Sequence, residues 1–78
     1  EIFILQTGSF KTSLEADTLR KKLELLDLNT SVEMFTTKKN EVWNRVMVGP
    51  FSSLAKIAEA QKVLNANKID SLLLKRKK

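Results

Sequence analysis

The sequence predicts an α+β fold with the element order βαββαβ, in which two helices cover one face of a four-stranded sheet. Strand-like apolar runs alternate with segments of helical periodicity, and a capping signal precedes each helical segment. The two halves of the chain also resemble each other at a shift of 41 residues, which places Gly8 on Gly49 and Phe10 on Phe51. These observations indicate one domain built from a duplicated βαβ unit.

The first half opens with a strand over residues 2–7, IFILQT, which Gly8 ends. Thr12 and Glu15 have the spacing of a capping box, so a helix is expected to begin there. Apolar residues recurring at intervals of 3, 4 and 3 give this helix a stripe that faces the core: Ala16, Leu19, Leu23 and Leu26.

Two further strands form the middle of the chain. Residues 30–36, TSVEMFT, and residues 42–48 are rich in β-branched and apolar side chains, and the KKNE segment between them predicts a turn. Pro50 is expected to block continuation of the third strand, because proline has no N–H for a sheet ladder.

The second helix is expected to start at a cap provided by Ser52 or Ser53. Its core-facing residues are Ile57, Ala60 and Leu64. Asn67 is predicted to adopt the left-handed conformation that ends a helix, and residues 69–74, IDSLLL, supply the fourth strand. The domain is thus assigned to residues 1–74 and is followed by a basic tail, 75–78. This tail is expected to be solvated, and no binding residue is predicted in it.

Composition limits the chemistry that the chain can perform. The absence of Cys and His excludes disulfides, thiolate chemistry and the usual zinc sites, so no metal or other cofactor is expected. The net charge of +5 favours attraction to polyanions, and no apolar run approaches the roughly 20 residues needed to span a bilayer. Glu1 leads directly into a strand, so we expect a domain of a longer protein whose targeting segment lies elsewhere.

Two helices cover one face of the sheet, so the other face is the candidate site. Val46 and Val48 mark the apolar side of the third strand, and the internal repeat places Leu5 and Thr7 on the same side. Gln6 then shares the uncovered face with Trp43, Arg45 and Met47. The binding residues predicted there are Gln6, Ser9, Trp43, Arg45 and, if Leu72 and Leu74 lie below it, Leu73.

This set combines an aromatic ring, a bidentate donor, an amide and a hydroxyl. A carbohydrate fits such a set, because its C–H groups can rest on an indole while its hydroxyls and any carboxylate receive hydrogen bonds. The alternative reading is structural: Trp43 covers a core edge and Arg45 only solvates the surface.

Two motifs resemble those of the sporulation-related repeat, or SPOR, family of bacterial cell-wall binding domains. QTGSF, residues 6–10, resembles the family's Q-x-G-S/A-F opening, and WNRVMVGPF, residues 43–51, resembles its W-x-R-V-x-V-G-P-F signature. Residues 13–23, SLEADTLRKKL, resemble its first helix. The resemblance covers nearly the whole chain, although Lys68 stands where the family usually has glycine after the second helix.

The resemblance implies an RNP-like antiparallel sheet and binding to septal peptidoglycan, in particular to glycan strands that amidases have stripped of stem peptides. Gln6, Ser9, Trp43 and Arg45 match the family's ligand-contacting positions, and Leu73 matches an apolar sheet position unless a one-residue slip puts Leu72 there. It also implies a location in the bacterial cell envelope, at the division septum. The isolated domain is expected to be monomeric and to contact neither nucleic acid nor membrane.

Three other functions compete with this one. The strand order, basic charge and sheet-borne aromatic are typical of RNA-recognition modules, but the run K/R-G-F/Y-G/A-F-V-x-F/Y that such modules use is absent. A protein-interaction domain remains open. Catalysis is not expected, because Glu33 has no acidic partner and no nucleophile with a base is visible.

Overall fold

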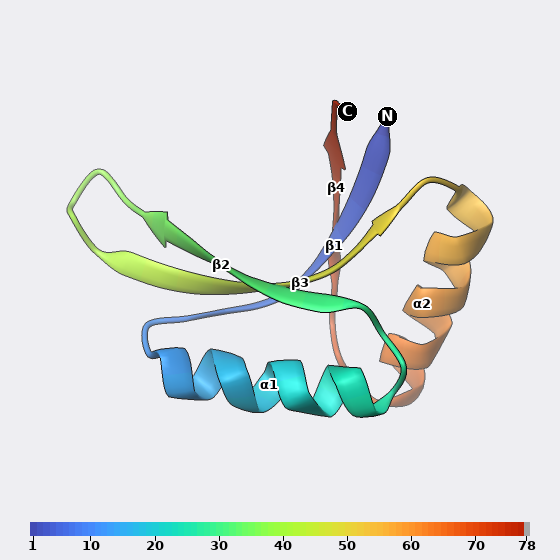
Figure 1. Cartoon of the computed structure of the whole chain (residues 1–78), viewed down its shortest axis with the longest axis horizontal. Coiled ribbons are helices and arrows are strands. Elements are labelled where there is room, and N and C mark those ends of the chain that lie inside the picture. Colours follow the sequence, from blue (N-terminus) through green and yellow to red (C-terminus); the bar gives the residue numbers. More distant parts are fainter. Residues whose placement is uncertain (78) are drawn as a thin grey trace.

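The structure is a computed structural model that describes residues 1–77. The elements in chain order are β1 (Ile2–Phe10), α1 (Ser13–Leu25), β2 (Thr30–Thr36), β3 (Val42–Phe51), α2 (Leu54–Ala66) and β4 (Leu72–Arg76). The first and last strands lie side by side, so the two ends of the chain meet at one margin of the molecule (Figure 1). Neither of these helices is long and apolar enough to cross a membrane.

The four strands form one antiparallel sheet in the order β2-β3-β1-β4, which confirms the predicted fold class. The sheet is strongly twisted: β1 and β4 stand upright in Figure 1, whereas β2 and much of β3 run across the view. α1 lies beneath β2 and β3, and α2 lies beside the end of β3 (Figure 1). Within residues 1–77, no helix lies on the opposite side of the sheet.

The core lies between the helices and the sheet. It contains the apolar positions predicted for both helices, together with alternate positions of β1 and β3. Their burial removes apolar surface from water, which is the main favourable contribution to folding. The buried cluster consists of Leu5, Ala16, Leu23, Val46, Val48, Ile57, Ala60 and Leu64, with Leu19 and Leu26 packed partly against it.

Both helices begin at the predicted type of cap. The backbone N–H of Glu15 donates to the Thr12 hydroxyl oxygen at 3.3 Å, and the N–H of Lys56 donates to the Ser53 hydroxyl oxygen at 3.2 Å. Each hydroxyl satisfies a donor that the first helical turn leaves without an intrahelical partner. Of the two serines considered from the sequence, Ser53 is therefore the cap.

The two helices also end alike, but not at the predicted residue. The left-handed residues are Asp27, with φ 63°, and Lys68, with φ 59°, at equivalent positions of the repeat. After α2, the N–H of Ile69 donates to the Leu64 carbonyl at 2.9 Å, as in a Schellman motif. Asn67 has φ −101°, so its prediction as the left-handed stop was wrong by one residue.

β3 differs from the prediction because it continues through Pro50 to Phe51. The β1–β3 register is irregular between Phe3 and Leu5, at the point where Pro50 lies on the partner strand. Irregular pairing tolerates a residue that cannot donate to the ladder. Gly49 adopts φ 130° there, a conformation that other residues rarely adopt.

The fourth strand also lies later in the chain than predicted. Residues 69–74 were expected to form it, but Ile69 packs against the core and β4 extends to Arg76. The predicted tail, 75–78, therefore contributes two residues to the sheet, and the boundary after position 74 falls inside β4. Lys78, the last residue of that tail, lies outside the described residues.

Candidate functional site

The strand register identifies the side chains on the face without a helix. Residues paired directly across neighbouring strands point to the same side, and successive residues of a strand alternate. Because Leu5, Val46 and Val48 are buried beneath the helices, their neighbours along β1 and β3 face away. The open face consists of Ile2, Ile4, Gln6 and Ser9 of β1, Ser31, Glu33 and Phe35 of β2, Trp43, Arg45 and Met47 of β3, and Leu72, Leu74 and Arg76 of β4.

A bulge in β1 brings Gln6 and Ser9 to the same face. They are three positions apart, so regular alternation would place them on opposite sides. The β1–β3 register shifts between Gln6 and Gly8, which leaves Thr7 as the extra residue. Ser9 then pairs with Arg45. Both side chains therefore lie on the open face, although β1 was predicted to end at Gly8 and instead continues through Ser9 to Phe10.

Three of the predicted site residues line one shallow hollow of about 340 Å³. Its walls are formed by Ser9, Phe35, Thr37, Trp43 and Arg45. The Arg45 Cζ atom lies 3.8 Å from the centre of the Phe35 ring, so the guanidinium stacks on an aromatic face. Stacking holds the planar group while its N–H edges stay available to an acceptor.

Phe35 is a site residue that the sequence analysis did not identify. It pairs directly with Trp43 across the β2–β3 hairpin, so two aromatic rings are neighbours on the open face. The signal was present in the sequence, because the short turn between these strands determines which residues pair. Extending that pairing from Trp43 to the partner strand would have led to Phe35.

A lysine also lies beside Trp43. Lys11, which follows β1, places its Nζ atom 5.3 Å from the centre of the Trp43 ring and 3.2 Å from the Glu41 carboxylate. Trp43 therefore lies near a cation, while part of its surface stays accessible to solvent. This arrangement adds positive charge beside the indole.

Gln6 lies apart from this hollow. It lines a second depression of about 260 Å³ at the junction of β1 and β4, together with Leu72, Asp70 and Ser71. Met47 lies between the two regions in the register and is only 3% exposed, although it points away from α1 and α2. Neighbouring side chains therefore close over the centre of the open face.

The predicted placement of Leu73 on the open face is corrected by the register. Leu73 pairs with Leu5, which belongs to the core beneath the helices, whereas Leu72 pairs with Gln6. Leu73 keeps 39% of its surface exposed because β4 is an edge strand. Leu72 is thus the apolar neighbour of Gln6. This is the alternative that the sequence left open, in which the strand is shifted by one residue.

The acidic residues of the described chain do not form a metal-binding cluster. Across residues 1–77, no cluster of three or more His, Cys, Asp or Glu side chains is suited to hold a metal. Glu33, the acid on the open face, accepts from Arg76 at 3.1 Å. On the far side of the molecule, a hydrogen bond from Arg20 lowers the pKa of Asp17.

The chain thus forms an RNP-like antiparallel sheet whose open face carries aromatic and polar side chains. The SPOR domain family model matches residues 1–75, so the chain belongs to the SPOR domain family. Family membership confirms the expectation of a binding module rather than an enzyme.

Two solved structures share this fold. The crystal structure of the RlpA SPOR domain from Pseudomonas aeruginosa aligns with a TM-score of 0.83 at 22% identity, covering 97% of this chain and 100% of that one. The solution structure of the peptidoglycan binding domain of the B. subtilis cell wall lytic enzyme CwlC aligns with a TM-score of 0.77 at 21% identity, covering 97% and 90%. No curated protein matches the sequence significantly.

Proposed function

We propose that this domain binds peptidoglycan through its open face and prefers glycan strands that lack stem peptides. Membership of the SPOR family supports the proposal, and the related CwlC structure is of a peptidoglycan binding domain. The observation that carries it is the hollow in which Ser9 and Arg45 lie beside the aromatic side chains Phe35 and Trp43. Gln6 and Leu72 extend the contact surface toward β4.

The chemistry of this hollow matches an amino-sugar polymer with free carboxylates. Sugar C–H groups can rest on the Trp43 ring, and hydroxyls can accept from or donate to the Ser9 hydroxyl. Removal of a stem peptide leaves a lactyl carboxylate on muramic acid, which the Arg45 guanidinium can bind in bidentate fashion. An intact peptide would obstruct so shallow a site, and this accounts for the proposed preference.

This function places the domain in the bacterial cell envelope, where peptide-free strands arise from amidase action at the division septum. We propose that the isolated domain acts as a monomer and needs no cofactor. Recruitment to the septum then depends on the ligand alone.

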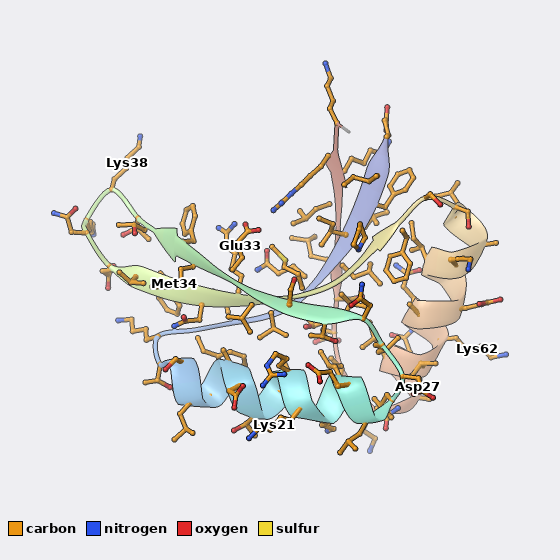
Figure 2. All side chains as sticks on the ribbon, viewed as in Figure 1. Lys21, Asp27, Glu33, Met34, Lys38 and Lys62 are labelled. Carbon is orange, nitrogen blue, oxygen red and sulfur yellow. The ribbon has the colours of Figure 1, made fainter. Side chains whose placement is uncertain are left out.

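The test is a pull-down of the purified domain with whole sacculi before and after amidase treatment. We expect greater retention on treated sacculi, and loss of retention for Trp43→Ala with its circular dichroism unchanged. Lys62→Ala, on the exposed surface of α2 (Figure 2), is the matched control and should bind like the unmodified domain. Equal retention on both kinds of sacculi would contradict the preference for peptide-free strands.

Single-stranded RNA is the rival ligand, since two neighbouring rings on a sheet and a net charge of +5 also suit bases and phosphates. Binding to a glycan through one ion pair should fall only modestly with added salt, whereas phosphate contacts produce a steep dependence. RNA binding as strong as glycan binding at physiological salt would favour the rival.

A further inference from the structure

An ion pair crosses the open face between the two edge strands of the sheet. The Arg76 guanidinium of β4 donates to both carboxylate oxygens of Glu33 of β2, at 3.1 and 3.4 Å. β3 and β1 lie between these strands in the sheet order, so the ion pair links the two edges of the sheet. Figure 2 places Glu33 on the side of β2 away from α1. The sheet's twist brings its two edges close enough for this contact.

Glu33 has a nearer candidate partner that it does not use. It pairs directly with Arg45 across the β2–β3 ladder, and opposite charges at such positions attract each other. Yet among residues 1–77 no ion pair joins Glu33 to Arg45; the Arg45 guanidinium stacks on Phe35 instead. Glu33 is thus held by the distant arginine rather than by the adjacent one.

We propose that Arg76 is a positioning residue: it holds the Glu33 carboxylate away from Arg45 and so keeps Arg45 available to an anionic ligand. The inference rests on the proposed function, in which Arg45 binds a carboxylate of the glycan. Without Arg76, Glu33 turns to its cross-strand neighbour and occupies the N–H groups that the ligand requires. Its negative charge then competes directly with the ligand's carboxylate.

The exposure of this ion pair makes the inference testable. The side chains of Arg76 and Glu33 are 41% and 49% exposed, and exposed ion pairs contribute little to stability. Substitution should therefore leave the fold intact. Because Lys75 also carries one positive charge on β4 but pairs with Phe3 on the opposite face, Lys75→Gln is the matched control for loss of charge.

The experiment measures the affinity of a peptide-free glycan oligomer for Arg76→Gln, Glu33→Gln and the double variant. We expect Arg76→Gln to weaken binding about twofold to fivefold, the range of an exposed ion pair. Glu33→Gln should bind at least as well as the unmodified domain, and so should the double variant, because no carboxylate then competes for Arg45. Lys75→Gln should change affinity less than Arg76→Gln.

A second measurement needs no ligand. The Arg45 Nε–H resonance should shift in Arg76→Gln and return in the double variant, because Glu33 contacts Arg45 only in the single variant. A double variant that binds as weakly as Arg76→Gln would overturn the inference and make Arg76 a direct ligand contact. Unchanged affinity in Arg76→Gln, or a loss of folding, would also overturn it. If the unmodified domain does not bind the glycan, the proposed function fails, while the Arg45 resonance still decides the inference.

Discussion

Arg45 combines two contacts that a lysine cannot make together. Its guanidinium lies over the Phe35 ring, with Cζ 3.8 Å from the ring centre, and its N–H groups can still bind a carboxylate. The Ser9 hydroxyl and Trp43 ring line the same hollow. The identity of the cation at this position, and not only its charge, should therefore decide binding.

We expect Arg45→Lys to weaken binding of a peptide-free glycan oligomer about tenfold, because the ammonium loses both the stack and the bidentate hydrogen bonds. Titration monitored by the fluorescence of Trp43, the only tryptophan, measures this change. Arg20→Lys on α1 is the control and should leave affinity unchanged. Equal losses in both variants would indicate that overall charge alone governs binding.

At the scale of the element, the two halves of the internal repeat end their helices with the same backbone conformation. Asp27 and Lys68 occupy equivalent left-handed positions without being glycine. The left-handed conformation costs a residue with a Cβ atom roughly 1–2 kcal/mol, so each helix end carries some backbone strain. The departure of Lys68 from the family's usual glycine therefore lies at a position where glycine has a physical advantage.

We expect Lys68→Gly to stabilise the domain by about 1 kcal/mol, because glycine adopts a positive φ without steric cost. Urea denaturation measures the free energy of unfolding. Lys62→Gly, within α2, is the opposing control and should destabilise by about 1 kcal/mol. Destabilisation by Lys68→Gly would mean that the lysine side chain outweighs the strain.

At the scale of the whole molecule, the two faces of the sheet have different roles: the helix-covered face contributes to stability, and the open face is the proposed binding surface. The helix-covered face holds fully buried residues such as Leu23, whereas Gln6 on the open face is only partly covered. A small domain has little stability to lose, since its core is modest. Substitutions on the two faces should therefore have different consequences.

Leu23→Ala should lower the free energy of unfolding by about 2–5 kcal/mol, because it removes buried methyl groups and leaves a cavity. Gln6→Ala should leave the melting temperature nearly unchanged and weaken glycan binding. Thermal melts and the glycan titration measure the two effects. If Gln6→Ala unfolds the domain, Gln6 contributes to folding rather than to the ligand surface.

Local patterns in the sequence determined much of this protein. The periodicity of apolar residues placed Leu23, Ile57 and Leu64 in the core, and serine and threonine caps located both helix starts. The internal repeat assigned Gln6 to the open face, but the bulge in β1 that turns Ser9 to the same face was not foreseen. These features depend on neighbours in the chain, so they can be read without the fold.

Only the tertiary structure decided what depends on strands distant in sequence. The register of β4 against β1 put Leu72 rather than Leu73 beside Gln6, because a slip of one residue reverses every side chain of a strand. The same pairing extended β4 to Arg76 and, through the twist of the sheet, brought it to Glu33. No local pattern encodes a contact between the two edge strands of the sheet, since it arises from the summed geometry of the three ladders between them.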